Sequence, residues 1–167
     1  MGAKIFIRKD GIIIISANIE ETEKTIAGDL EIWKNLKQNL STIFEGHENL
    51  SKLLAQRTRY ISEKKTTAAI TPKVKVDNAS DPHFSIVRIE ARDHLGMLYK
   101  ISKVFSELDI RIHSAKVSTQ GGRGIDVFYV SHQNKKILFE KLVRRTKEKI
   151  ISAMMVKNPE EDRKSVV

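Results

Sequence analysis

The segment VRIEARDHLGMLYKISKVFSEL, residues 87–108, decides the fold of this chain. Its first part alternates apolar and charged residues, which predicts a strand over Phe84–Ala91 with one apolar face. Beyond the loop Asp93–Gly96, apolar residues recur every three or four positions, as on one side of a helix that ends at Leu108. The fold is therefore expected to contain a strand that leads through a short loop into an amphipathic helix.

Two more strands and a helix are predicted on the C-terminal side of this segment. The strands cover Ile110–Thr119 and Gly124–Ser131, and an amphipathic helix covers Lys136–Met154. The order β-α-β-β-α indicates a split βαβ arrangement, an α+β fold with two helices on one face of an antiparallel sheet. Because strand 124–131 is apolar on both sides, we expect its second face to meet another part of this chain or another chain.

The N-terminal half is predicted to repeat the later part of this pattern. Strands over Ala3–Lys9 and Ile12–Ile19 flank Asp10-Gly11, a dipeptide typical of tight hairpin turns. A long amphipathic helix over Glu23–Glu45 and a short one over Asn49–Gln56 follow the hairpin. The chain thus holds a back half-unit, ββα, in front of a complete unit.

Matching tripeptides support this internal repeat. Ala3-Lys4-Ile5, before one turn, matches Ala115-Lys116-Val117, before the other. The expected organisation is a partial unit over residues 3–56, a linker over 57–71, a strand over 72–77 that completes the first unit, a complete unit over 84–154 and a polar tail over 155–167.

Charge, cysteine content and the length of apolar runs limit the classes of protein to which this chain can belong. Lys and Arg number 30 against 21 Asp and Glu, a net charge of +9, and cysteine is absent, which excludes disulfides and thiolate metal sites. No apolar run is long enough for a membrane span, and the N-terminus lacks a signal-peptide stretch, so we expect a cytoplasmic protein. The densest basic cluster, Lys141–Lys147, has Glu140 and Glu148 beside it and favours a solvated helix face over a phosphate-binding patch.

Several runs of this sequence resemble the ACT domain. They are Val74–Ser80, Val87–Ile101, Ala115–Thr119 and Gly124–Val130, and Ile5–Gly11 with Trp33 and Leu53–Arg57 is similar to the back half of a preceding ACT domain. The narrower resemblance is to the C-terminal tandem ACT region of the bifunctional uridylyltransferase/uridylyl-removing enzymes that act on the PII nitrogen-signal protein. It implies a ferredoxin-like βαββαβ unit, a regulatory function that senses an amino acid (glutamine), and the catalytic domains of a parent enzyme as partners.

The candidate ligand-binding residues lie in the loop that opens the first helix of the complete unit. They are Asp93, His94, Leu95, Gly96, Met97 and Leu98. A glycine at a helix start lets a ligand approach the backbone, and the free N–H groups of residues 95–98, with the helix dipole behind them, suit an amino acid's carboxylate. In a ligand site, Asp93 is expected either to cap the helix or to receive the ligand's ammonium group. The alternative is a purely structural loop with no ligand, in which Asp93 only caps the helix and Gly96 only permits the turn.

The family motif at this loop is typically Asp-Arg-Pro-Gly, whereas this chain has His94-Leu95 in the middle positions. Losing the proline removes a fixed φ and leaves the loop less preorganised.

Catalytic motifs of the parent enzyme are missing from this sequence. It contains no Gly-Ser turn or Asp-x-Asp pair for nucleotidyl transfer and no His-Asp dipeptide for a metal-dependent hydrolase. The five histidines, His47, His83, His94, His113 and His132, include no pair at the i, i+4 spacing of a helical metal site. We therefore predict a chain with no catalysis, metal or cofactor.

The sequence leaves two alternative functions and predicts an assembly state. A basic nucleic-acid-binding module on a similar fold is disfavoured because Phe128 and Tyr129 point to opposite faces of their strand, and a ligand-free assembly domain stays open. The half-unit lacks a first strand and helix, so we expect a homodimer that covers its apolar face. The candidates for that face are Ile5, Ile7, Ile13, Ile15, Leu30, Trp33, Leu36 and Leu40.

Overall fold

The computed structural model describes residues 2–8, 10, 12–18, 30–46, 49–54 and 70–155. The chain divides into two compact units, one made of Met1–Asn18 with Ala68–Val167 and the other of Ile19–Thr67. The hairpin that the sequence groups with the following helix therefore belongs to the same unit as the C-terminal half.

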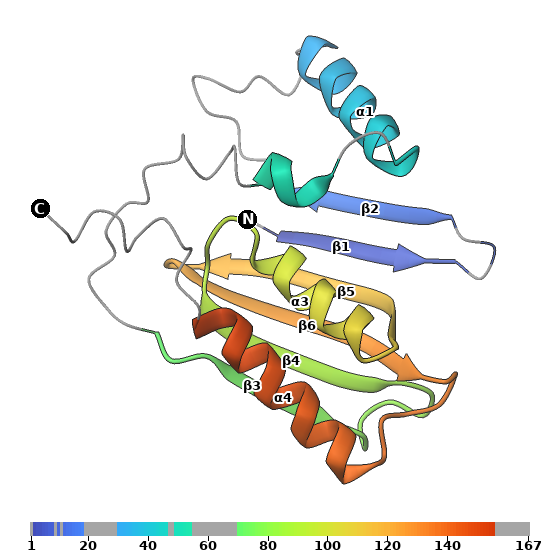
Figure 1. The fold of residues 1–167 in the computed structure, drawn as a ribbon, viewed down its shortest axis with the longest axis vertical. Coiled ribbons are helices and arrows are strands. Elements are labelled where there is room, and N and C mark those ends of the chain that lie inside the picture. Colours follow the sequence, from blue (N-terminus) through green and yellow to red (C-terminus); the bar gives the residue numbers. More distant parts are fainter. Residues whose placement is uncertain are drawn as a thin grey trace, which may run out of the picture. The chain divides into compact units, whose positions relative to one another are not determined.

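The larger unit is built on an antiparallel sheet of six strands with the order β2-β1-β5-β6-β4-β3 (Figure 1). The strands are β1 (Gly2–Ile7), β2 (Ile13–Asn18), β3 (Lys73–Asp77), β4 (Ser85–Arg92), β5 (Ile110–Gln120) and β6 (Arg123–His132). Helices α3 (Met97–Glu107) and α4 (Glu140–Met155) lie side by side on one face of this sheet. The ferredoxin-like α+β class predicted from the sequence is confirmed.

A single hydrophobic core lies between the two helices and the sheet. Alternate residues of β4 and β6 are buried, as Val87, Ile89, Phe128 and Val130 show, because the side chains of a strand point in turn to its two faces. Helix α3 buries Met97, Ile101, Val104 and Phe105 on one side, the stripe that its 3.6-residue period predicts. The rings of Phe105 and Phe128 meet edge to face with centroids 5.3 Å apart.

The two matching tripeptides lie opposite each other in this sheet. Strands β1 and β5 are antiparallel, with Lys4 opposite Lys116, Ala3 opposite Val117 and Ile5 opposite Ala115. A local two-fold axis therefore passes between the two lysines and relates the hairpin β1–β2 to the hairpin β5–β6. The sheet continues from the half-unit into the complete unit within one chain, whereas the outer edge of β2 has no strand beside it among the described residues.

Strand β3 differs from its expected position. The sequence assigns residues 72–77 to the first unit, but β3 pairs with β4 from Lys73 opposite Glu90 to Asp77 opposite Ile86, at the far edge from β1 and β2. Val74 and Val76 pack against the core of the complete unit, which gives the strand its place. The strand that closes this unit beside β4 thus precedes β4 in the chain rather than following α4.

The start of one helix also differs from the sequence prediction, whereas the start of the other agrees with it. Helix α4 begins at Glu140, four residues later than predicted, because Ile137 is already fixed in the core and its N–H donates to Ser85 Oγ at 2.7 Å. Helix α3 begins at Met97 after a turn at residues 95–96.

The smaller unit contains α1 (Leu30–Phe44) and a short helix at residues 50–54. Gly46, in the left-handed region at φ 74°, follows α1, as the predicted helix end requires. None of the residues of α1 is buried, and its apolar side chains Trp33, Leu36 and Leu40 are more than two-fifths exposed. The beginning of the predicted helix 23–45, most of the linker 57–71 and the tail from residue 156 lie outside the described residues.

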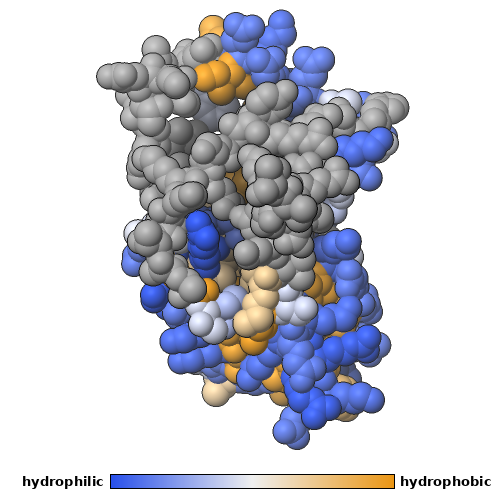
Figure 2. Space-filling model, turned by 60° about the vertical axis from the view of Figure 1, so that its left-hand side comes forward, coloured by the Kyte–Doolittle hydropathy of each residue, from blue (hydrophilic) through white to orange (hydrophobic). Residues whose placement is uncertain are grey.

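The surface of the molecule is mixed in polarity. On the face seen in Figure 2, most of the coloured surface is hydrophilic (blue), with hydrophobic patches (orange) between. Among the described residues, no helix combines the length and hydropathy that crossing a membrane requires.

Candidate functional site

The predicted ligand loop connects β4 to α3. It begins after Arg92 and ends at Gly96, and it lies next to the turn between β5 and β6, because the Asp93 N–H donates to the Gly122 carbonyl at 2.9 Å. The loop is thus held beside this turn, with Asp93 and Leu95 exposed, and Leu98, the second residue of α3, is exposed as well.

Gly96 gives the loop its shape. It occupies the N-cap position of α3 with φ 85° and ψ 1°, a left-handed conformation that strongly favours glycine, and no side chain caps the helix. Of the two alternatives for Asp93, the one in which it caps α3 is therefore not the one that the structure has. The Met97 N–H, expected to be free, donates to the His94 carbonyl at 3.1 Å.

Asp93 is fixed by contacts from a distant strand. Its carboxylate accepts a hydrogen bond from Thr119 Oγ1 of β5 at 2.8 Å. Together with the bond from its N–H to Gly122, this ties the loop to both sides of the β5–β6 turn. The carboxylate remains exposed, so it is positioned to meet a cationic group from solvent.

The other candidate residues divide between surface and core. His94 is half-buried, with Nδ1 3.0 Å from its neighbour's carbonyl at Leu95, a hydrogen bond in the tautomer that carries the proton on Nδ1. Met97 is buried against Gly124 of β6. A Cβ added to Gly124 would lie only 3.0 Å from the Met97 sulfur. Five of the six candidates thus border the surface, whereas Met97 packs into the core and attaches α3 to the sheet.

Asp126 of β6 lies near this loop and was not among the predicted site residues. It lies on the helix-facing side of β6, is 2% exposed, and its Oδ1 has no hydrogen-bond partner. Burial, followed by the negative charge of Asp93, raises the pKa of Asp126 to about 6, although the Ser118 N–H donates to this carboxylate and opposes the shift. The available signal was a carboxylate at an inward position of an otherwise apolar strand.

Two hollows lie elsewhere on this unit, and residues 93–98 line neither of them. One, of about 220 Å³, is lined by Gly2, Ala3, Lys4, Ser16, Lys116, Val117 and Ser118. A broader groove of about 920 Å³ lies at the other end of β5, beside Arg111 and His113. The described residues contain no group of three or more histidine or acidic side chains that could hold a metal ion.

His113 lies where this groove meets the β5 bulge. Its ring packs on Phe84 with centroids 4.3 Å apart, and Nε2 lies 2.8 Å from Ser131 Oγ. Burial, with a smaller effect from Arg111, lowers the pKa of His113 and so disfavours the charged form of its ring. These contacts describe a half-buried strand histidine that packs on Phe84.

Comparison with known proteins identifies the family. The family model described as "ACR9-like, ACT-like domain" matches residues 73–159, which is more than half of the chain. The chain belongs to this ACT-like family. The match contains β3 through α4 of the ACT-like chain, and therefore includes the strand that precedes the β-α-β-β-α unit.

Curated relatives of this ACT-like chain share one name, bifunctional uridylyltransferase/uridylyl-removing enzyme. The enzyme from Rhodospirillum rubrum is 28% identical over 147 residues, which are 88% of this chain and 15% of that enzyme. The one from Methylococcus capsulatus is 29% identical over 135 residues (78% and 15%), and the one from Azospirillum brasilense is 31% identical over 86 residues (51% and 9%). The resemblance stated from the sequence is confirmed, and the ACT-like chain spans about one-seventh of the first two relatives. No solved structure matches it.

Proposed function

We propose that this chain is a regulatory region that binds an amino acid, glutamine, at the β4–α3 loop and controls the catalytic domains of a cytoplasmic uridylyltransferase/uridylyl-removing enzyme. The observation that carries the proposal is the left-handed, uncapped Gly96 beside the exposed and anchored carboxylate of Asp93. The names of the three relatives described above, each a bifunctional uridylyltransferase/uridylyl-removing enzyme, support the enzyme context.

The two ends of an amino acid match the two sides of this loop. The ligand's carboxylate approaches the backbone at Gly96, where no Cβ intervenes and the positive end of the α3 dipole lies nearby. Its ammonium group meets Asp93, whose carboxylate is held by Thr119. Because Asp126 adds a second negative group below Asp93, a cation here also relieves the repulsion between the two carboxylates.

Binding at this loop is connected to the junction between the two hairpins. Asp93 contacts Thr119 near the end of β5, and β5 pairs with β1 along the local two-fold axis. A ligand that prefers one arrangement of this junction shifts the population of the attached domains toward it, which is the regulatory step we propose.

The first test is the variant Gly96→Val. A valine at φ 85° is strained and places a side chain where the ligand's carboxylate approaches, so we expect glutamine binding in calorimetric titration to be lost. The matched control is Gly46→Val, which also forces valine into the left-handed region, at φ 74°, with no atom within 4 Å of the new Cβ. Loss of binding in Gly96→Val alone supports the site, and equal binding by the wild type and both variants contradicts it.

The chain is proposed to bind without catalysing. We expect purified protein to show neither uridylyl transfer nor uridylyl removal on the PII signal protein, because the motifs for both reactions are missing from the sequence. Metal-dependent turnover above that of a mock preparation would contradict this part of the proposal.

Assembly into a homodimer is proposed for the β2 edge. Ile7, Ile13 and Ile15 share the helix-facing side of the hairpin and are 40%, 45% and 61% exposed, next to a strand edge without a partner in the described chain. Light scattering at micromolar concentration should give about twice the 19.0 kDa chain mass. Ile15→Lys should give a monomer, whereas Leu138→Lys, at an equally exposed apolar position outside the hairpin, should leave the dimer intact. A monodisperse wild-type monomer would rule out this assembly.

A further inference from the structure

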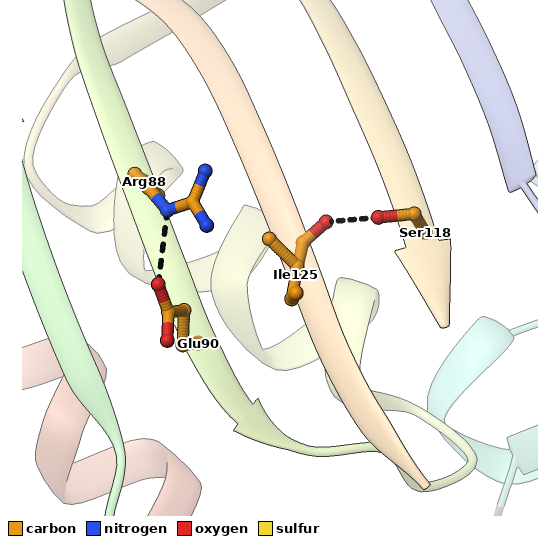
Figure 3. A network of polar contacts seen from close by, with 4 residues as sticks. All are labelled: Arg88, Glu90, Ser118 and Ile125. Carbon is orange, nitrogen blue, oxygen red and sulfur yellow. Dashed lines mark hydrogen bonds and ion pairs between the residues drawn. The ribbon is translucent and has the colours of Figure 1, made fainter. Parts of the chain in front are cut away.

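The face of the sheet opposite α3 and α4 carries side chains in regular rows. Since neighbouring strands are in register, residues that pair across them form lines perpendicular to the strands. Figure 3 looks onto this open face, with Arg88 and Glu90 on β4 and the Ser118 hydroxyl directed to the Ile125 carbonyl at 2.8 Å.

One row is almost entirely cationic. From β1 to β3 it reads Lys4, Lys116, Val127, Arg88 and Lys75, each residue paired with the next in the sheet register. All four cations are exposed, and the row spans about 19 Å at the usual separation of strands. Lys4 faces Lys116 directly, and Arg88 faces Lys75, an arrangement that repels unless an anion lies between them.

Little negative charge balances this row. Within the residues that the structure describes, Arg88 pairs with Glu90 at 3.0 Å, and the ion pairs found do not involve Lys4, Lys75 or Lys116. The row therefore presents several uncompensated charges along one line.

A hollow lies over one end of the cationic row. The cavity of about 220 Å³ has Lys4 and Lys116 on its walls together with Ser16 and Ser118, and Gly2 also lines it. Two ammonium groups and hydroxyl donors around a space of this size suit one phosphate group.

The neighbouring row supplies aromatic rings. It contains Phe6 opposite Ser114 and then Tyr129 opposite Ile86, two residues away from the cationic row along each strand. Phe6 is 47% exposed and Tyr129 is half-buried, so both rings border solvent on the open face. The prediction that Phe128 and Tyr129 point to opposite faces is confirmed, and Phe6, from the other hairpin, gives the open face a second aromatic ring.

We propose that this open face binds single-stranded nucleic acid, with phosphates along the cationic row and bases on Phe6 and Tyr129. A line of cations beside a line of aromatic rings is the combination that unpaired strands require, because their bases are free to stack. An acidic protein surface would match the lysines but would not need the rings. In double-stranded nucleic acid the bases are stacked on one another, so a duplex would contact the lysines but not the aromatic rings. The proposal is independent of amino-acid binding at the β4–α3 loop.

Fluorescence anisotropy of the 167-residue chain with a labelled oligouridine of about 12 nucleotides tests the proposal. Three phosphate contacts, one held by Lys4 and Lys116 together and one each at Arg88 and Lys75, predict a slope of roughly −2 for log K against log salt. Lys4→Gln with Lys116→Gln should make that slope shallower by about 0.7. Phe6→Leu and Tyr129→Leu should each weaken binding at least about fivefold without changing the slope.

Matched controls lie on the other side of the molecule. Lys141→Gln with Arg145→Gln removes two exposed charges from α4, and Phe139→Leu changes a ring that is 76% exposed, and neither variant should alter binding or slope by more than the measurement error. The proposal is overturned if the oligonucleotide does not bind at about 50 mM salt, or if the α4 charges matter as much as the row. Equal competition by a duplex, by polyphosphate or by polyglutamate also overturns it.

Discussion

Replacing Phe105 by alanine is expected to destabilise the larger unit by about 3 to 5 kcal/mol. The Phe105 ring is fully buried, lies edge to face against Phe128, and belongs to the stripe that attaches α3 to the sheet. Truncation removes this ring contact and leaves a cavity in the core that the surrounding strands cannot close. Urea unfolding followed by far-ultraviolet circular dichroism should show the loss as a lower midpoint with an unchanged slope.

The matched control for this change is Phe139→Ala. Phe139 is a phenylalanine of the same unit but is 76% exposed, so its truncation should change the free energy of unfolding by no more than about 0.5 kcal/mol. Similar losses in both variants would mean that Phe105 does not hold α3 on the sheet.

Replacing Asp126 by asparagine is expected to stabilise the protein above pH 6, by up to about 3 kcal/mol. The folded-state pKa of Asp126 is raised from 3.8 to about 6, so the folded protein keeps a proton that the unfolded chain releases near pH 4. The contribution of Asp126 to the free energy of unfolding therefore falls as the pH rises from about 4 to about 6, and it stays low above pH 6. Asparagine cannot ionise, so the variant should lack this fall and should equal the wild type below pH 4.

Urea unfolding from pH 3.5 to 8 measures this difference directly. Asp81→Asn serves as a control of opposite sign, since the Asp81 carboxylate accepts the N–H groups of Phe84 and His83 at 2.8 Å each, and these bonds lower its pKa. Its replacement should cost stability at neutral pH and less in acid. If Asp126→Asn is less stable than the wild type across the whole range, the Asp126 carboxylate is stabilising, contrary to the burial argument.

The elements that local sequence signals control were predictable. The Asp10-Gly11 turn, the alternation over Phe84–Ala91 and the helical period up to Leu108 each depend on neighbouring residues, and the structure has a hairpin, a strand and a helix at these places. The match between the tripeptides at Lys4 and Lys116 also indicated the repeat that the sheet register shows.

Features that depend on distant partners were not predictable in the same way. The pairing of β3 with β4 is decided by which sheet edge offers Val74 and Val76 a core, and no local pattern contains that choice. Likewise, Asp93 is an ordinary capping residue by type, yet its carboxylate contacts Thr119, 26 positions away in the sequence. The unpaired Oδ1 of Asp126 arises only after β4 and β5 have paired with β6 on either side of it.

The place of β3 has a consequence for how such units can be copied. A duplication, deletion or expression boundary set between residues 77 and 84 would separate β4 from its neighbour and would leave an orphan strand on the preceding module. The segment that is copied contains the whole folded unit only if its N-terminal boundary lies upstream of residue 73, where β3 begins. In an array of such units, each unit would thus carry its edge strand as a leader in the connection before it, and insertions in that connection would act on the unit that follows.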